Sequence, residues 1–234
     1  MLNNSKGEIP CMNLFDIVGP VMVGPSSSHT AGAVKIGETS LRLLNEPIAK
    51  AQIDFHGSFL ATGKGHGTDR ALVAGLLGFR VDDERIPEAF AYAEEAGMKV
   101  VMGAVDLGPD ANPNSVRLRL TGIHGKQLEI IAASIGGGRI QVQSIDGLRC
   151  VFSGSHPTLI VQNDDTPGEI AYVADILSLY HINIATLQLD RDSRGGHGMT
   201  VVETDQEIPQ TALDTLAAQR GILKVTYLPG AKED

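Results

Sequence analysis

The sequence predicts an α+β protein in two parts, a mixed α/β part followed by a ferredoxin-like βαββαβ unit. From residue 156 to 230, apolar patterns follow the order strand, helix, strand, strand, helix, strand, which is the split plan of four antiparallel strands and two helices. Before a break near Gly147 to Ser155, the chain is glycine-rich and mixes helix-like with strand-like segments. We therefore place one domain at residues 1–150 and a second at 156–230.

In the first part, helices are expected beside polar runs, and strands occupy its second half. AGAVKIGETSLRLLN, from Ala31, has apolar residues at helical spacing, and another apolar helix is expected from Ala71. Residues 86–97 predict a short helix with a solvated acidic face. Strand-like segments are MKVVMGAVDLG, SVRLRLTG and KQLEIIAASIGGGRIQVQSIDG, the last a hairpin joined through Gly136, Gly137 and Gly138.

In the second part each element has its own pattern. EIAYVADILSLYHI repeats apolar residues every three to four positions and predicts a helix, and PQTALDTLAAQRG predicts another, opened by Pro209. Strong turn residues make up NDDTPG and SRGGHG. The four predicted strands are PTLIVQN, NIATLQLDRD, MTVVETD and ILKVTYL.

Composition excludes several classes of function. The chain has 234 residues, a formal net charge of −9 and no basic run, so a nucleic-acid surface is not expected. No apolar stretch is long enough to span a membrane, and MLNNSKGEIP lacks the apolar core of a signal peptide, so we expect a cytoplasmic protein. The two cysteines, Cys11 and Cys150, predict reduced thiols, at least one of them buried, and are too few for a four-thiolate cluster.

The run GPSSSHT, from Gly24 to Thr30, precedes the first predicted helix and is expected to form its loop and N-cap. One hydroxyl from Ser27, Ser28 or Thr30 satisfies a cap. Several hydroxyls beside free N–H groups make an anion receptor, and His29 adds a side chain that exchanges protons near neutral pH. The alternative is a polar surface loop with redundant caps.

A second polar run, GKGHGTD, precedes the helix expected from Ala71. Its alternating glycines allow close approach of backbone to a ligand, and the spacing is not that of a phosphate-binding Walker loop. The alternative is a flexible surface loop in which Asp69 is an ordinary cap. Two such runs favour one shared polar pocket, and the polar residues of the second run are Lys64, His66, Thr68 and Asp69.

Together, the runs GPSSSHTAGA and GSFLATGKGHGTD resemble those of the beta subunit of iron-sulfur-dependent L-serine dehydratase. The resemblance covers nearly the whole chain. The resemblance implies that the first part is a serine dehydratase beta domain, similar to an allosteric substrate-binding domain. It also implies that L-serine becomes aminoacrylate, then pyruvate and ammonia. It implies a 4Fe-4S cluster held by cysteines of an alpha subunit, and a beta chain that is inactive alone. The resemblance leaves open whether the base that removes the α-proton lies on the beta chain or on the alpha chain. The implied catalytic candidates are His29, Lys64 and His66, and the implied substrate-binding residues are Ser26, Ser27, Ser28, Thr30, Gly65, Thr68 and Asp69.

The second part resembles an ACT domain, a module that binds amino acids in metabolic enzymes. The resemblance implies an effector site at the first strand-to-helix turn and homodimerisation through this domain. The implied effector-binding residues are Asp164, Asp165, Pro167, Gly168 and Asn183. Three alternatives stay open: a turn without a ligand, a domain that serves only assembly, and a whole chain that is a regulatory amino-acid-binding module without a catalytic role.

Overall fold

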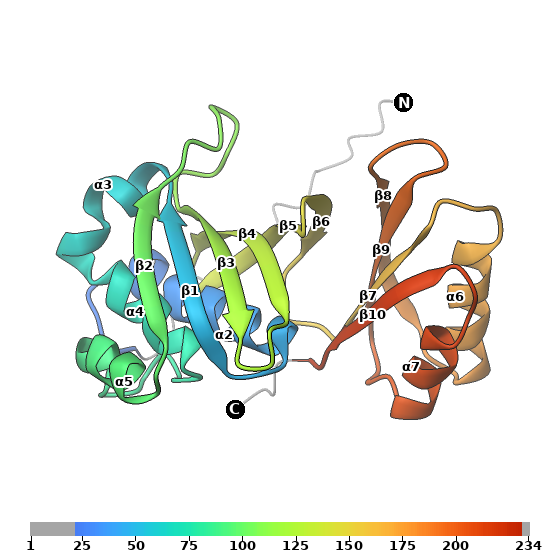
Figure 1. Cartoon of the computed structure of the whole chain (residues 1–234), viewed down its shortest axis with the longest axis horizontal. Helices are drawn as coiled ribbons and strands as arrows, with labels where there is room; N and C mark the ends of the chain where they lie inside the picture. The colour runs from blue at the N-terminus through green and yellow to red at the C-terminus, as the bar shows by residue number, and fades with distance from the viewer. Residues whose placement is uncertain (1–21, 231–234) are drawn as a thin grey trace, which may run out of the picture.

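The computed structural model describes residues 22–230 and contains two β-sheets. The first has six strands in the order β2-β1-β3-β4-β5-β6, and the second has four in the order β10-β7-β9-β8. Figure 1 shows the sheets beside each other, with α2 and α4 behind the first sheet and α6 and α7 on the outer side of the second. The predicted α+β fold is confirmed.

The first sheet joins one parallel pair, β1 with β2, to an antiparallel series from β1 through β6. Ala51, Ile53 and Phe55 alternate with polar residues along β1 and pack into the core under the helices. The strands are β1 Ile48–Phe55, β2 Lys99–Ala104, β3 Ser115–Gly122, β4 Gln127–Gly136, β5 Arg139–Ile145 and β6 Leu148–Phe152. The helical segments are η1 Ser27–Gly32, α2 Ala33–Leu44, α3 Gly57–His66, α4 Thr68–Leu76, η2 Ile86–Glu88 and α5 Ala89–Glu95.

Helices α2 and α4 approach each other closely through two glycines. A Cβ built on Gly75 would lie 2.0 Å from the carbonyl oxygen of Val34, and one on Gly37 would lie 2.4 Å from that of Leu72. Such distances are far inside van der Waals contact, so a larger residue at either position forces the helices apart. The α2–α4 pair supports the site, because η1 contacts α2 and α3 contacts α4.

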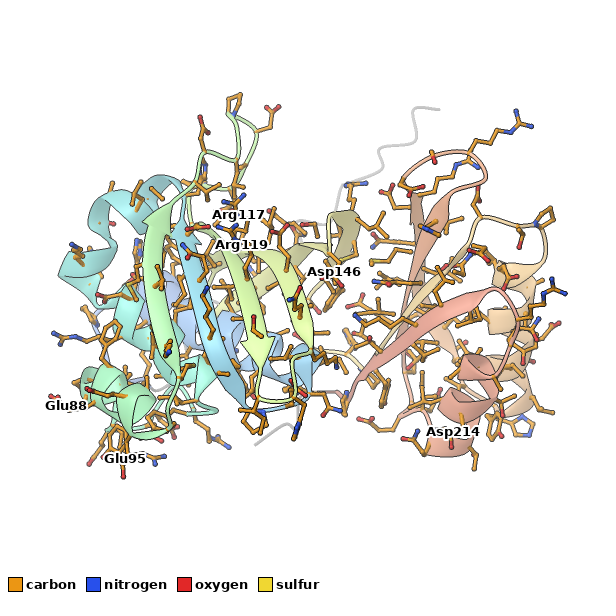
Figure 2. All side chains as sticks on the ribbon, in the orientation of Figure 1. Glu88, Glu95, Arg117, Arg119, Asp146 and Asp214 are labelled. Carbon is orange, nitrogen blue, oxygen red and sulfur yellow. The ribbon has the colours of Figure 1, made fainter. Side chains whose placement is uncertain are left out.

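The other face of the first sheet is polar, and Figure 2 shows Arg117 and Arg119 on it. Asp54 is buried there and accepts hydrogen bonds from Gln52, Arg117 and Arg119, the two arginine bonds being 3.1 and 2.8 Å long. Burial raises the pKa of Asp54, but these hydrogen bonds outweigh it and the net shift is downward. The Asp54 carboxylate therefore has a structural role, since both of its oxygens accept hydrogen bonds within the sheet.

The second sheet has the predicted βαββαβ order, which is confirmed. Its inner strand β7 lies between β9 and β10, and apolar residues such as Leu159 and Val202 pack against Leu177 of α6 and Leu216 of α7. The elements are β7 Thr158–Asp164, α6 Glu169–Leu179, β8 Ile184–Arg191, β9 His197–Thr204, α7 Gln210–Ala217 and β10 Ile222–Leu228.

The two sheets share buried surface. Ile160, Met199, Val201 and Leu228 of the second sheet belong to the core cluster of the first, and Gln188 donates a 3.0 Å hydrogen bond to the carbonyl of Val151 on β6. The domain bounds of 1–150 and 156–230 stay predictions, because this contact gives no independent measure of where one folding unit ends.

Local structure corrects the sequence analysis at four places. Strand β1 was not expected, and β6 lies inside the predicted break. The predicted loop over the GKGHG run is wrong, because residues 57–66 form α3, followed by Gly67 at φ +70 and then α4. The predicted loop over GPSSSHT is also wrong, since its second half is the π-helix η1.

Candidate functional site

The π-helix η1 carries the hydroxyl-rich run and is continuous with α2. Ser26 is its N-cap, and the Ser26 Oγ accepts a 3.2 Å hydrogen bond from the backbone N–H of His29. The cap is therefore Ser26, and not Ser27, Ser28 or Thr30 as expected, because the helix starts four residues before Ala31. Ser27 and Ser28 lie partly exposed in the first turn, and Thr30 is buried.

One face of α3 meets the His29 ring. Ser58, Thr62 and His66 are spaced four residues apart, which places them on the same side of the helix. The Nε2 of His29 lies 3.1 Å from the Thr62 Oγ1 and 3.5 Å from the Ser58 Oγ, and the His29 and His66 ring centroids are 4.9 Å apart. We call Ser26, His29, Ser58, Thr62 and His66 the His29 cluster.

Sequence reasoning missed Ser58 and Thr62 as site residues. The signal was present, because the spacing S-x3-T-x3-H aligns three polar side chains on one face of any α-helix. It was not used, since the run around it was expected to be a loop. Phe59 was missed too; it is buried at 1% exposure and packs its ring edge-on to His29, with centroids 5.3 Å apart.

The protonation states in the His29 cluster follow from its contacts. Burial and the nearby His66 lower the pKa of His29, which favours the neutral ring at neutral pH. The Nδ1 of His66 lies 3.0 Å from the Thr62 carbonyl, which only accepts, so Nδ1 is the donor and Nε2 of His66 keeps its lone pair in the neutral ring. The cluster therefore presents a neutral imidazole able to accept a proton, with hydroxyls beside it.

Buried hydroxyls without a partner surround this part of the fold. Thr30, Thr68, Ser115 and Ser134 each bury a side-chain oxygen that has no hydrogen bond in the described chain. Ser134 points at η1, because a Cβ built on Gly32 would lie 2.1 Å from its Oγ. Unpaired buried polar atoms cost stability and are uncommon in folded proteins. Thr30 and Ser134 therefore leave two buried hydroxyls at η1 that no group of the described chain pairs with.

The two polar runs meet at His29 and His66 as expected, but Lys64 and Asp69 do not join the His29 cluster. Lys64 is two residues from Thr62, about 200° around the helix, and it faces away from His29. It makes no hydrogen bond or ion pair within the described chain. Gly65 has no atom within 4 Å of a built Cβ, and Asp69 accepts only from the adjacent N–H of Arg70.

The strand-to-helix turn of the second sheet pairs most of its polar side chains, and one buried oxygen beside it, Oε2 of Glu169, has no partner in the described chain. The Asp165 carboxylate accepts 2.9 Å hydrogen bonds from Gly195 N–H and Arg191, which together lower its pKa, and Asp164 Oδ1 lies 3.6 Å from His197 Nδ1. Thr166 donates to Glu169, Pro167 is exposed, and Gly168 is at φ +104. An effector site here stays a prediction.

Asn183 does not face that turn, so its predicted place is wrong. Its backbone N–H donates to Gln206 and its side chain donates to Asp205, at the end of the sheet where β9 finishes. Strands β7 and β8 both run antiparallel to β9, so the start of β8 and the end of β7 lie at opposite ends of the sheet.

The described residues do not fit an iron-sulfur cluster. Between residues 22 and 230 no three His, Cys, Asp or Glu side chains gather as metal ligands. Cys150 is buried on β6, and burial raises the pKa of its thiol to about 12, far from the thiolate that a cluster needs. Cys11 lies outside the described residues. In the same range, no helix is both long and apolar enough to cross a bilayer.

Comparison with known proteins finds relatives over nearly the whole chain. A family profile described as "Serine dehydratase beta chain" matches residues 11–144. The chain is 39% identical to a probable L-serine dehydratase beta chain of Bacillus subtilis, over 92% of this chain and 97% of that one. It is 37% identical to the L-serine dehydratase beta chain of Peptoniphilus asaccharolyticus, over 84% and 89%. An ACT domain from a GTP pyrophosphokinase of Chlorobium tepidum covers 31% of this chain at 19% identity and a TM-score of 0.27.

Proposed function

Because the chain belongs to the serine dehydratase beta chain family, we propose that it is the beta subunit of an iron-sulfur-dependent L-serine dehydratase that works in the cytoplasm. In this proposal an alpha subunit holds a 4Fe-4S cluster, and the complex converts L-serine to pyruvate and ammonia. The residues described here supply no cluster ligands, so the proposal assigns those ligands to the alpha subunit and predicts no turnover by the beta chain alone.

The observation that carries the proposal is the meeting of η1 and α3 at His29. Residues 29 to 37 positions apart in sequence bring an imidazole with a lowered pKa against two hydroxyls and a second imidazole. A structural role alone needs one capping hydroxyl, which Ser26 provides. The remaining groups fit a small polar substrate that has a carboxylate to bind and a proton to lose.

We assign each group a role in that chemistry. Ser27, Ser28, Ser58 and Thr62 hydrogen-bond the carboxylate or ammonium group of L-serine, and Thr30, Gly65 and Thr68 shape the walls around η1 and α3. His29 Nε2 accepts the α-proton or orients the substrate for a base on the alpha chain, and His66 supports His29. Lys64 and Asp69 have no role in this site.

The direct test is anaerobic serine deamination by the reconstituted alpha-beta complex. General acid-base groups contribute about 10²–10⁴-fold to rate, so His29→Ala is expected to lower kcat by at least about 100-fold while the subunits still assemble. His124→Ala, in an exposed turn, is the matched control and keeps wild-type activity. The proposal fails if His29→Ala retains full turnover.

The same variant separates catalysis from sensing. If His29→Ala keeps turnover but abolishes L-serine binding measured by calorimetry, the chain is a regulatory amino-acid-binding module and not part of the catalytic machinery. Binding and turnover lost together support the catalytic role.

We also propose that two copies associate through the second sheet. Strand β8 is at the sheet edge, and Leu187 and Leu189 on it are 37% and 47% exposed. Exposed apolar edge strands are normally covered in a stable protein. Leu189→Lys is expected to shift the complex to a lower mass in analytical ultracentrifugation without changing its fold.

A further inference from the structure

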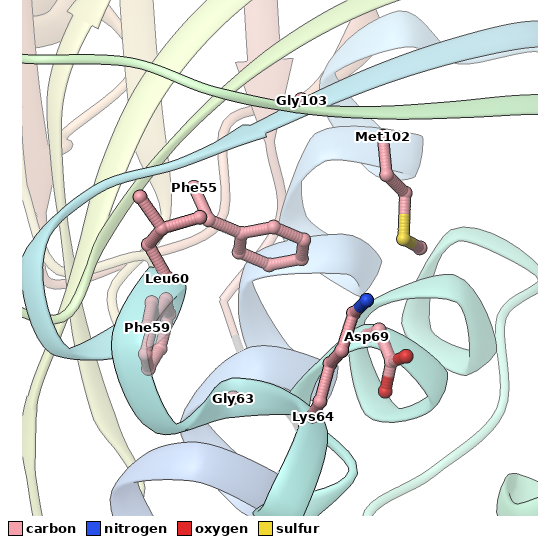
Figure 3. Close-up of a pocket in the computed structure, with 8 residues that line it drawn as sticks. All are labelled: Phe55, Phe59, Leu60, Gly63, Lys64, Asp69, Met102 and Gly103. Atoms are coloured by element: carbon pink, nitrogen blue, oxygen red, sulfur yellow. The ribbon is translucent and has the colours of Figure 1, made fainter.

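On the side of α3 that faces away from His29, the structure holds a cavity. Its volume is about 240 Å³, and it lies between α3, the start of α4 and the edge strand β2. Phe55, Phe59, Leu60 and Met102 supply most of its wall, and two charged groups, Lys64 and Asp69, stand on one side (Figure 3). Nothing in the proposed serine chemistry uses this space.

The two charged groups are unengaged. Lys64 makes no ion pair or hydrogen bond in the described chain, and it forms none with Asp69, although both line the same cavity. Asp69 accepts one hydrogen bond, from the neighbouring backbone N–H of Arg70. A cation and an anion that line one cavity without pairing leave room for a ligand with both charges.

The rest of the wall selects against a polar side chain. Phe55 and Phe59 are buried and stack edge to face with centroids 6.5 Å apart, and Leu60 and Met102 are exposed at 48% and 38%. Apolar surface of this kind gains free energy when an aliphatic group covers it, whereas a hydroxyl would lose its hydrogen bonds to water. The wall therefore favours an aliphatic group over the hydroxymethyl group of serine.

The volume sets the size of the ligand. At about 30 Å³ for each water molecule in the liquid, 240 Å³ holds about eight water-sized groups. Valine and leucine are of that size. A free amino acid has one carboxylate for Lys64, one ammonium group for Asp69 and one aliphatic side chain for the aromatic wall.

We propose that this cavity binds a small aliphatic amino acid, with its carboxylate on Lys64, its ammonium group on Asp69 and its side chain against Phe55, Leu60 and Met102. The site is separate from the His29 cluster, and Phe59 lies between them, because its ring lines the cavity and also contacts His29. The proposal does not require that the serine site be catalytic.

The test follows L-leucine binding to the full chain, alone and in complex with the alpha subunit. Calorimetry gives the affinity, and the methyl signal of Met102 in protein labelled at methionine methyl groups locates the ligand. L-leucine is expected to shift Met102 saturably and to leave Met199, buried in the second sheet, unmoved. Removing one charge from the ligand, in 4-methylpentanoate or 3-methylbutylamine, is expected to weaken binding at least tenfold.

Variants assign the contacts. Lys64→Met and Asp69→Asn are expected to weaken L-leucine binding at least tenfold each, and Leu60→Asn, at a half-exposed position that does not threaten the fold, also weakens it. Lys50→Met, on the polar face of the first sheet, is the matched control. His29→Ala keeps L-leucine binding while it loses L-serine binding, so the failure of one proposal is distinguishable from the failure of the other.

Three results would overturn the proposal. The first is an absence of saturable L-leucine binding in both the free chain and the complex. The second is equal affinity for the amino acid, the acid and the amine. The third is a Met102 shift produced by the alpha subunit alone, which would mean that a side chain of the partner fills the cavity.

Discussion

Two polar runs at helix starts, GPSSSHT before α2 and NDDTPG before α6, differ in what their side chains do. At NDDTPG, Asp165 is held by Arg191 and Gly195, Asp164 lies beside His197, and Thr166 bonds Glu169. We call it the closed turn because these polar side chains are paired, Thr166 locally with Glu169, and Asp164 and Asp165 with the β8–β9 segment. At GPSSSHT the side chains reach another element, α3, and hydroxyls beside η1 stay without partners.

The difference teaches what distinguishes a structural turn from a site. Both runs have the composition of a capping segment, and both offer oxygen atoms and N–H groups. Only η1 brings its polar groups against those of a second helix, with a histidine whose pKa is lowered. Convergence of unsatisfied groups from separate elements is therefore better support for a site than composition.

After the loss expected for His29→Ala, the largest effect is expected from the hydroxyls that face His29. Ser58→Ala with Thr62→Val removes two hydrogen-bonding groups, each worth about 0.5–1.5 kcal/mol, so kcat/KM of the complex should fall by about 5-fold to 150-fold. Thr166→Val with Ser193→Ala removes one hydroxyl from the closed turn and one from the β8–β9 turn that bonds to it, and should leave kcat/KM unchanged. An equal loss in both double variants would break the comparison.

A smaller effect is expected from the charge of His66. Because His66 lowers the pKa of His29, His66→Gln should raise that pKa and reduce the neutral form of His29 in mild acid. The acid limb of the pH-rate profile then moves to higher pH, with a several-fold loss of kcat near pH 6 and little change near pH 8. His197→Gln, beside Asp164, should not move the limb, and an unmoved limb in His66→Gln would remove His29 from the titrating step.

The second sheet was predictable from sequence because each of its elements has an uninterrupted pattern. PTLIVQN and EIAYVADILSLYHI are bounded by turn residues, and their apolar residues pack in the core as the pattern requires. Strand β1 had an equally readable signal, since Ala51, Ile53 and Phe55 alternate with polar residues. The pattern is short and adjoins the glycine-rich run from Gly57 to Gly67, whose composition alone predicts a loop.

The candidate site was only half predictable, because α3 contradicts its own composition. Three glycines lie in its ten residues, yet the segment is helical. Gly63 packs closely against α4, because a Cβ built on it would lie 3.3 Å from the Cβ of Thr68. Tertiary contact has overridden helix propensity there. Once the segment is a helix, its periodicity places His66 on the side of His29 and Lys64 on the opposite side. A loop has no such fixed periodicity.

The smallest effect is expected in the closed turn, and it concerns stability instead of activity. The hydrogen bonds from Gly195 and Arg191 hold the pKa of Asp165 below its ordinary value, so the ionised carboxylate favours the folded state. That contribution is present above the unfolded pKa of about 3.9 and is lost as the pH falls through the lower folded value. Asp165→Asn should therefore lower the urea midpoint slightly at pH 7, with the gap to wild type closing toward the acid range, and should leave serine turnover unchanged. A matching loss of turnover would show that the turn communicates with the His29 cluster, and the two regions would then have to be treated as one functional unit.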